Sequence, residues 1–393
     1  MLNGTRVVDL SRYIAGPFCA TILGDLGAEV IRIEQPGGAE DRDQEPATPN
    51  GDNLRYLMLG RNKKGITLDY SQPRGMDLLR RLLETTDVLV ENFSPPVSEK
   101  LGLTPEALKE VKPDLIVVSV SGFGSTGPRR VHLGFDPVAQ AESGAMSFTG
   151  FPEGEPSRGQ VNWVDLSTGL YAALGAVLAL LHRTITGEGQ SVEAALFDTA
   201  VSYVAFQGTA AEYQVLGRQR PRIGNAGYYV YIDTCAAKDG MVILAAIGSS
   251  QWRRFAKVIG RPDLAQDDRL ANDSLRYENR HIVVPIVQDW ARTLTVDEIL
   301  GAMEEARIPC GRVSGVGEMV VNPQVLAREL FQQLDVPGAG MVPHPRLPLR
   351  LSRTSTVIDS PAPGVGEHNQ QVYCGTLGMT QDELAALQAD GIV

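Results

Sequence analysis

The sequence lacks several features that mark common classes of protein. Only four of its 393 residues are cysteine, at positions 19, 235, 310 and 374, with no C-x-x-C pair and no histidine at ligand spacing. This pattern predicts reduced thiols, a cytoplasmic location and no metal site. The first residues also lack a basic segment followed by an apolar one, so we expect no signal peptide.

Positive charge is scarce as well. Lys and Arg total 36 against 47 Asp and Glu, which gives a formal net charge of -11. Nucleic acid and anionic membranes bind clustered positive charge, so we expect neither as a partner. With 43% hydrophobic and 21% charged residues the chain is typical of soluble globular proteins, and its length suggests two or three domains.

Long apolar runs are also missing. The longest, residues 170–181, contains only apolar residues and glycine, and Asp165, Ser167 and Thr168 precede it. A run of this length is too short to span a bilayer, and a helix that is apolar on all sides is buried. We therefore expect a core helix that begins after Thr168, with Asp165 just ahead of its N-terminus.

The first 200 residues alternate between strand-like and helix-like patterns. Strands are expected at 5–10, 28–34, 65–70, 87–93 and 114–124, and helices at 16–27, 73–86 and 104–111. Apolar strands separated by helices predict βαβ units and a parallel sheet, with ligands at the carboxyl ends of its strands. None of the loops there contains a G-x-G-x-x-G or P-loop motif, which disfavours a dinucleotide oxidoreductase or a P-loop enzyme.

Composition changes near residue 220, where we place a domain boundary. A hairpin is expected at 228–246, several helices at 250–307, an extended Pro-rich segment at 336–352 and a last helix in the tail. The predicted fold is α/β: a large Rossmann-like domain (1–200 plus 325–393) and a smaller α+β domain (225–320). Linkers are expected at about 200–225 and 320–350.

Asp165 is the residue with the clearest chemical potential. Aspartate is among the best N-capping residues, so one interpretation is purely structural. Ser167 and Thr168 can cap the helix instead, and a carboxylate near a helix N-terminus is kept ionised by the helix dipole. An ionised, partly desolvated carboxylate beside a cleft can also attack an acyl group. The residues alone leave both interpretations open.

An ordered set of short motifs extends this reading. The set comprises `AGPFCATILGDLGAEVIRIEQPGG`, `RNKKGITLDY`, `VENFSP`, `SGFGSTGP`, `GFDPVAQAESGAMSFTG`, `LHRTITGEGQ`, `IPCGRV` and a late `GEH`. Together they resemble the class III CoA-transferases, the group that includes the formyl-CoA and L-carnitine CoA-transferases, over essentially the whole chain. The resemblance implies an interlocked homodimer in which Asp165 is the catalytic aspartate.

The resemblance also implies a reaction. CoA passes from an acyl-CoA donor to a small carboxylic acid through an aspartyl mixed anhydride and an aspartyl-CoA thioester. Covalent catalysis of this kind preserves the thioester energy, provided that water is excluded. CoA and acyl-CoA are then substrates, and no cofactor is expected to be permanently bound.

Further site residues follow from the resemblance alone. It places Tyr13, Ile14 and Ala15 at the reacting end, Asn92 and Phe93 in the CoA cleft, and Lys100 at a phosphate. Where some relatives carry a basic residue this chain has Gln35, so Arg32 or Arg61 is expected to supply that charge. The remaining expected substrate contacts are Phe135 and Asp136, and the lid candidates are Gly224 and Gly227.

Two alternatives remain. The related α-methylacyl-CoA racemases carry a histidine in a Gly-His-Asp tripeptide, but this chain has Gly134-Phe135-Asp136, and His132 is three residues away. A non-catalytic acyl-CoA-binding protein, with Asp165 as a cap, is the other alternative. The acids themselves are not identified, although Arg222, Tyr228 and Tyr229 would suit a second carboxylate, as in succinate.

Overall fold

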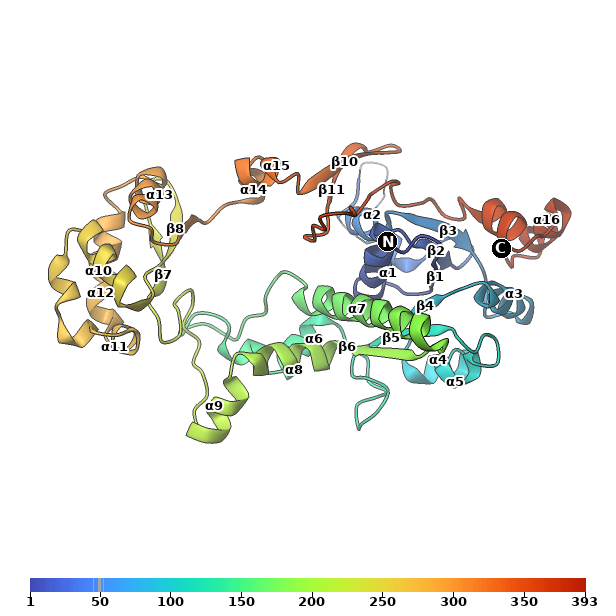
Figure 1. Cartoon of the computed structure of the whole chain (residues 1–393), viewed down its shortest axis with the longest axis horizontal. Helices are drawn as coiled ribbons and strands as arrows, with labels where there is room; N and C mark the ends of the chain where they lie inside the picture. Colours follow the sequence, from blue (N-terminus) through green and yellow to red (C-terminus); the bar gives the residue numbers. More distant parts are fainter. Residues whose placement is uncertain (45, 49–50, 52) are drawn as a thin grey trace. The chain divides into compact units, whose positions relative to one another are not determined.

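The structure, a computed structural model, describes residues 1–44, 46–48, 51 and 53–393. Its internal contacts group the chain into two units (Figure 1). The first unit comprises Met1–Ala145, Gly159–Gly217 and Leu326–Val393, and the second comprises Met146–Arg158 and Arg218–Val325. The first unit therefore contains both termini.

The first unit is built on a six-stranded parallel sheet. The strands run in the order β3-β2-β1-β4-β5-β6, so the chain begins at the centre and builds outward in both directions. This order places a topological switch point between β1 and β4, where ligands of open α/β sheets bind. The strands are β1 (Arg6–Asp9), β2 (Glu29–Glu34), β3 (Lys63–Thr67), β4 (Val88–Glu91), β5 (Ile116–Ser121) and β6 (Ser191–Ala195).

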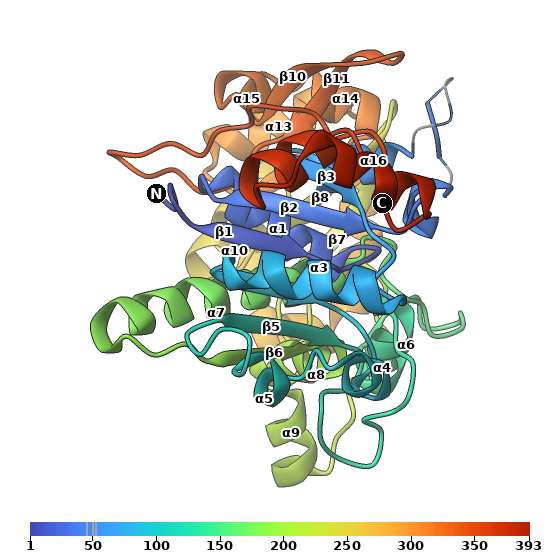
Figure 2. The same cartoon turned by 90° about the vertical axis from the view of Figure 1, so that its right-hand side faces the viewer.

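Both faces of this sheet are covered, which explains why its strands are apolar throughout. Neighbouring residues of one strand point to opposite faces: Val7 packs with α1 and α7, whereas Val8 packs with α3 and α16. Figure 2 looks onto the face that α3 and α16 cover. The mixed α/β fold with a parallel sheet that the sequence predicts is confirmed.

The helices of the first unit follow the strands closely. They are α1 (Ala15–Asp25), α2 (Leu54–Gly60), α3 (Pro73–Glu84), α4 (Pro95–Leu101), α5 (Pro105–Leu108), α6 (Asp136–Glu142), α7 (Trp163–Thr186), α8 (Leu196–Phe206), α9 (Thr209–Leu216) and α16 (Gln381–Ala389). Helices α1, α3, α5 and α16 match expected helices, whereas no helix was assigned from the sequence to α2, α4, α6 or α9. A loop rich in Gly, Pro and acidic residues is expected at 36–53, and its positions 45, 49, 50 and 52 lie outside the described residues.

Helix α7 differs from the sequence-based expectation in two ways. It begins at Trp163, so Asp165 lies in its first turn rather than ahead of it. It is also not buried on all sides, because the side chains Leu170, Leu174, Leu178, Leu181 and Ile185 are exposed along one face. Within the described residues α7 alone is long and apolar enough to cross a membrane, and a helix in a protein core meets the same test.

The second unit combines a small antiparallel sheet with helices. The predicted hairpin is present as β7 (Ile232–Ala236) and β8 (Met241–Ala245), and β9 (Cys310–Arg312) pairs with β8. Trp252 and Phe255 lie fully buried in its core. Its helices are α10 (Gly248–Val258), α11 (Asp273–Glu278), α12 (Arg280–Ala291), α13 (Val296–Glu305) and α14 (Val316–Val320), and α15 (Pro323–Ala327) lies at the boundary.

The C-terminal segment returns to the first unit. The segment 336–352, expected to be extended, overlaps a hairpin of β10 (Phe331–Val336) and β11 (Gly340–Pro345). The predicted tail helix is present as α16, and its Leu384 and Leu387 join the core on one face of the parallel sheet. The tail thus completes a layer that the first 200 residues leave open.

A buried ion pair links β1 to β3 beneath the site. The Lys63 ammonium donates to Asp9 Oδ2 at 2.8 Å and to the Pro17 carbonyl at 2.9 Å, and both charged side chains are fully buried. Burial acts to raise the pKa of Asp9, but Lys63 and Arg32 outweigh it and lower this pKa overall. The second Asp9 oxygen accepts from the Ser11 amide at 3.0 Å, which fixes the start of the following loop.

We expect Lys63→Met to lower the free energy of unfolding by about 3–5 kcal/mol, since it leaves the Asp9 charge buried and unpaired. Lys64→Met is the matched control: this neighbouring lysine pairs with Glu29 at the half-exposed surface, so the loss should stay below about 1 kcal/mol. The double variant Asp9→Asn/Lys63→Met should recover part of the loss. Urea unfolding measures all three, and equal losses for Lys63→Met and Lys64→Met would contradict the expectation.

Candidate active site

A cavity of about 570 Å³ opens at the switch point of the parallel sheet. Its walls are the loops that follow β1, β4 and β5, together with the start of α7. Most of the expected site residues line it, in particular Tyr13, Ile14, Ala15, Asn92, Phe93, Phe135, Asp136 and Asp165. Loops widely separated in sequence therefore meet at one sheet edge, as the strand pattern predicts.

Asp165 lies in this cavity and is only 8% exposed. Its burial and the nearby negative charge of Asp136 raise its pKa to about 6, while a hydrogen bond from Asn162 and the charge of Arg55 act in the opposite direction. Desolvation is the largest cause of this rise in the pKa of Asp165, and the helix dipole expected from the sequence does not prevent it. The carboxylate is still mostly ionised at neutral pH, and its raised pKa makes it a stronger base than an exposed aspartate.

Asp136 lines the cavity, but its carboxylate is bound by the protein itself. It is fully buried, and its Oδ2 accepts from the backbone amides of Val164 at 2.9 Å and Asp165 at 3.2 Å. Its other oxygen accepts from Gln140 at 2.5 Å. Both oxygens of this carboxylate thus accept from protein donors, and its expected contact with substrate stays a prediction.

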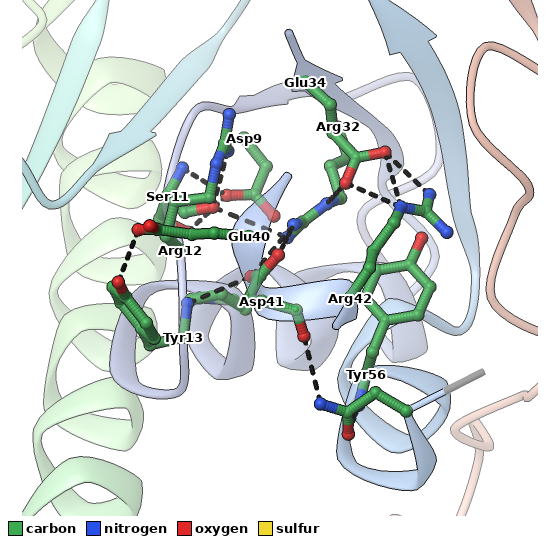
Figure 3. A network of polar contacts seen from close by, with 12 residues as sticks. Asp9, Ser11, Arg12, Tyr13, Arg32, Glu34, Glu40, Asp41, Arg42 and Tyr56 are labelled. Atoms are coloured by element: carbon green, nitrogen blue, oxygen red, sulfur yellow. Dashed lines mark hydrogen bonds and ion pairs between the residues drawn. The ribbon is translucent and has the colours of Figure 1, made fainter. Parts of the chain in front are cut away.

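The loop after β1 is held by a network of buried charges (Figure 3). Arg32 donates to both oxygens of Asp41, at 2.7 and 2.9 Å, and to Glu34 at 3.1 Å. Asp41 in turn accepts from the Tyr13 amide at 3.0 Å, and Arg42 closes the network by donating to Glu34 at 2.6 Å. Tyr13 takes the unusual left-handed φ of 68°, and this network supports it.

This network corrects one sequence-based prediction. Arg32 is 1% exposed and paired with carboxylates, and Arg61 is equally buried in a pair with Asp25 at 2.7 Å. Neither guanidinium is exposed to the cavity, so the structure does not support either as a phosphate ligand. A sequence cannot distinguish such arginines from solvated ones, because their partners are set by the fold.

Asn92 and Phe93 follow β4 and line the cavity. The Asn92 side chain accepts from the Arg12 amide at 2.9 Å and donates to the Arg12 carbonyl at 2.8 Å, so it ties the loop after β4 to the loop after β1. The Phe93 amide donates to Glu91 at 2.8 Å. Asn92 is thus an anchor of the site, and the Phe93 ring forms part of its wall.

Phe135 occupies the position where a racemase carries its histidine. Its ring is half exposed and meets the Tyr13 ring edge-on at 5.6 Å between centroids. His132 instead meets Phe123, with centroids 6.4 Å apart, and no histidine is among the cavity-lining residues that the structure describes. The cavity therefore offers a carboxylate but no imidazole to remove an α-proton.

The remaining predicted residues do not line this cavity. Lys100 is exposed on α4. Gly224 and Gly227 belong to the second unit, where Gly224 has a φ of +62° and its amide donates to Gly150 at 2.9 Å. Arg222 lies in the same unit and donates to the Gly154 carbonyl at 2.9 Å.

The sequence reasoning missed four residues at the cavity or behind it. Arg12, Glu40 and Arg55 line the cavity, and Gln140 lies behind it against Asp136. Gln140 left a usable signal, since it follows Asp136 by one helical turn in `GFDPVAQ`. Arg55 left none, because no element was assigned from the sequence to the segment that forms α2. In the described part of the chain no group of three potential metal ligands is present.

Comparison with known proteins agrees with this geometry. The model of CoA-transferase family III matches residues 2–369. The succinyl-CoA–D-citramalate CoA-transferase of Chloroflexus aurantiacus is 34% identical, covering 100% of this chain and 98% of that protein. The succinate–glutarate CoA-transferase of Agrobacterium fabrum is 35% identical over 94% of each protein.

The fold is similar to that of solved proteins too. The crystal structure of a CAIB/BAIF family protein from Brucella suis matches with a TM-score of 0.85 at 33% identity, covering 95% of this chain and 98% of that one. Sequence and fold agree over nearly the full length. The chain is therefore an enzyme of the CoA-transferase class and belongs to CoA-transferase family III.

Proposed function

We propose that this enzyme moves CoA from an acyl-CoA thioester to a small carboxylic acid, with Asp165 as the covalent nucleophile. The observation that carries the proposal is the placement of the Asp165 carboxylate, largely desolvated and with a raised pKa, in the wall of a 570 Å³ cavity. Nucleophilic carboxylates are activated in such surroundings. The first unit then acts as the CoA-binding domain, and the second unit as the smaller domain.

The exchange proceeds in four balanced steps. The Asp165 carboxylate attacks the donor thioester carbonyl, the C–S bond breaks, and CoA thiolate leaves behind an aspartyl mixed anhydride. The thiolate attacks the aspartyl carbonyl and expels the donor acid, which gives an aspartyl-CoA thioester. The acceptor carboxylate attacks this thioester, which releases the thiolate and forms a second aspartyl anhydride. The thiolate then attacks the acceptor carbonyl of this anhydride, the C–O bond to the aspartyl carboxylate breaks, and the new acyl-CoA and the free Asp165 carboxylate result.

We propose a dicarboxylic acid as one of the two acids. Both relatives described above are named for dicarboxylic substrates. Arg55 is exposed, lines the cavity, and lies close enough for its charge to lower the pKa of Asp165. A guanidinium at this place suits the carboxylate of a bound acid that does not react.

The phosphate groups at the adenine end of CoA need a cation to bind them. Arg129 and Arg130 pair with Glu142 and Glu99 at the surface, and Lys63 is buried. We propose that the exposed Lys100 contacts a phosphate of CoA.

We propose a cytoplasmic location for the enzyme. The four cysteines are all free thiols, which supports this location.

We also propose that the enzyme is a homodimer. Leu170, Leu174, Leu178, Leu181 and Ile185 form an exposed stripe along α7, and apolar stripes of this length are usually covered. A second copy of the chain is the occupant that the family resemblance implies.

Sedimentation equilibrium at micromolar concentration should give about twice the chain mass of 42.4 kDa. The double variant Leu174→Glu/Leu178→Glu should shift the equilibrium toward monomer, because it places charges in the middle of the stripe. A monomeric wild-type mass would contradict the proposal.

The nucleophile is tested by trapping it. Hydroxylamine added during turnover should label Asp165, as identified by peptide mapping. Asp165→Ala should lose at least about 10³-fold in transfer rate while still binding CoA, because covalent catalysis is lost. Asp198→Ala is the control, since this aspartate is not among the residues lining the cavity. Label on another carboxylate, or undiminished exchange by Asp165→Ala, would refute the assignment.

The acid-binding role of Arg55 is tested by the ratio of kcat/KM for succinate over acetate as acceptor. We expect Arg55→Gln to lower this ratio about 10-fold or more, because a charge-assisted hydrogen bond is removed. Arg55→Lys keeps the positive charge but not the paired donors of the guanidinium. Its ratio should therefore lie between those of the wild type and Arg55→Gln. An unchanged ratio in Arg55→Gln would exclude this role.

A further inference from the structure

Two buried side chains of α6 form hydrogen bonds to the segment that carries Asp165. The Asp136 carboxylate, fully buried at the start of α6, accepts from the amides of Val164 and Asp165 at 2.9 and 3.2 Å. These amides belong to the first turn of α7, where no intrahelical acceptor exists for them. Asp136 therefore caps α7 from a different helix.

Gln140, one turn further along α6, adds hydrogen bonds to Asp136 and to Gly159. Its amide nitrogen donates to Asp136 Oδ1 at 2.5 Å and to the Gly159 carbonyl at 3.3 Å. Its oxygen accepts from the Gly159 amide at 2.8 Å. The two side chains thus hold residues 159–165 at both ends, and Asp165 is at one of these ends.

We propose that Asp136 is a positioning residue for the transfer reaction: through α7 it holds the Asp165 carboxylate at the cavity wall, and Gln140 orients Asp136 for this task. The proposal rests on the proposed function, in which Asp165 is the nucleophile. Asp136 and Gln140 act through α7 and not on the reacting atoms, since both side chains are buried and hydrogen-bonded to the protein. A displacement of about 1 Å at a reacting group lowers the rate on the order of 10²-fold. Loss of these hydrogen bonds should therefore have a measurable effect on the transfer rate.

The position of Asp136 also affects the pKa of Asp165. Asp136 takes up the first free amides of α7, which would otherwise stabilise the Asp165 anion. Its negative charge also acts directly on Asp165, after desolvation the second cause of that raised pKa. The groups that oppose it are Asn162 at the start of α7 and Arg55 from α2. The other charged groups lining the cavity are Arg12 and Glu40.

Three variants test the proposal. Asp136→Asn keeps an oxygen to accept from α7 but removes the charge, and Gln140→Met keeps the charge but removes the link to Gly159. Glu142→Gln is the control: it makes the same charge change on α6, at an exposed pair with Arg129 outside the cavity lining. For each, the measurements are kcat, the KM for succinyl-CoA, the pH profile of kcat/KM and the rate of hydroxylamine trapping at Asp165.

We expect Asp136→Asn to lower kcat at least about 10-fold with little change in KM, because the nucleophile is displaced while the cavity is retained. The acid limb of its pH profile, near pH 6 in the wild type, should move down by roughly 0.5–1 unit as the like charge disappears. Gln140→Met should also lower kcat but leave the limb in place. Glu142→Gln should match the wild type in every measurement.

The outcomes separate this proposal from the proposed function. If wild-type enzyme traps Asp165 but Asp136→Asn does so at an unchanged rate with an unmoved acid limb, the positioning role is wrong. If the wild type never labels Asp165, the proposed function itself fails. Should Asp136→Asn not fold, as judged by circular dichroism, Gln140→Met decides the matter: wild-type kcat in that variant overturns the positioning role.

Discussion

The buried ion pair between Arg32 and Asp41 is the interaction on which the catalytic end of the sheet depends. Asp41 accepts from the Tyr13 amide and so supports a tyrosine in a left-handed conformation that costs on the order of 1–3 kcal/mol. Lys63 and Asp9 extend the same buried charge system to the start of that loop. Buried charges tolerate few geometries, because each must keep its partner within hydrogen-bonding distance. The loop after β1, which lines the cavity, is therefore held by electrostatics as much as by packing.

The second constraint is the close approach of α7 to that loop. A Cβ atom on Gly169 would lie 2.5 Å from the Ala15 carbonyl oxygen, so only glycine lets the helix lie against the start of α1. Gly122 and Gly134 meet in a similar way, since a Cβ on Gly122 would lie 2.8 Å from the Gly134 Cα. These two contacts bring the loop after β5, the segment before α6 and the first turn of α7 to one cavity. Asp165 meets the loop after β1 because small residues allow the backbones to touch.

Charge is distributed in this protein in a way that composition does not reveal. The cations of the `RNKKG` segment look solvated in the sequence, yet Arg61 and Lys63 are buried in ion pairs. Arg55, which the sequence does not single out, is exposed at the cavity. An acidic enzyme that acts on anionic substrates needs only a few cations, provided that they lie at the site. Arg61 and Lys63 stabilise the fold through their buried ion pairs, whereas Arg55 is accessible from the cavity.

The sequence by itself determined the parallel α/β architecture, the hairpin of the second unit, the tail helix and the family, because hydrophobic periodicity and ordered motifs are local properties of the chain. It also singled out Asp165 and the loops after β1 and β4. Only the tertiary structure decided where α7 begins, that Arg32 and Arg61 are buried, and that Asp136 accepts from the first amides of α7. The physical reason is distance along the chain: Asp136 reaches amides 28 and 29 residues away, and Lys63 reaches Asp9 across 54. Such partners are chosen by packing, and no local pattern records them.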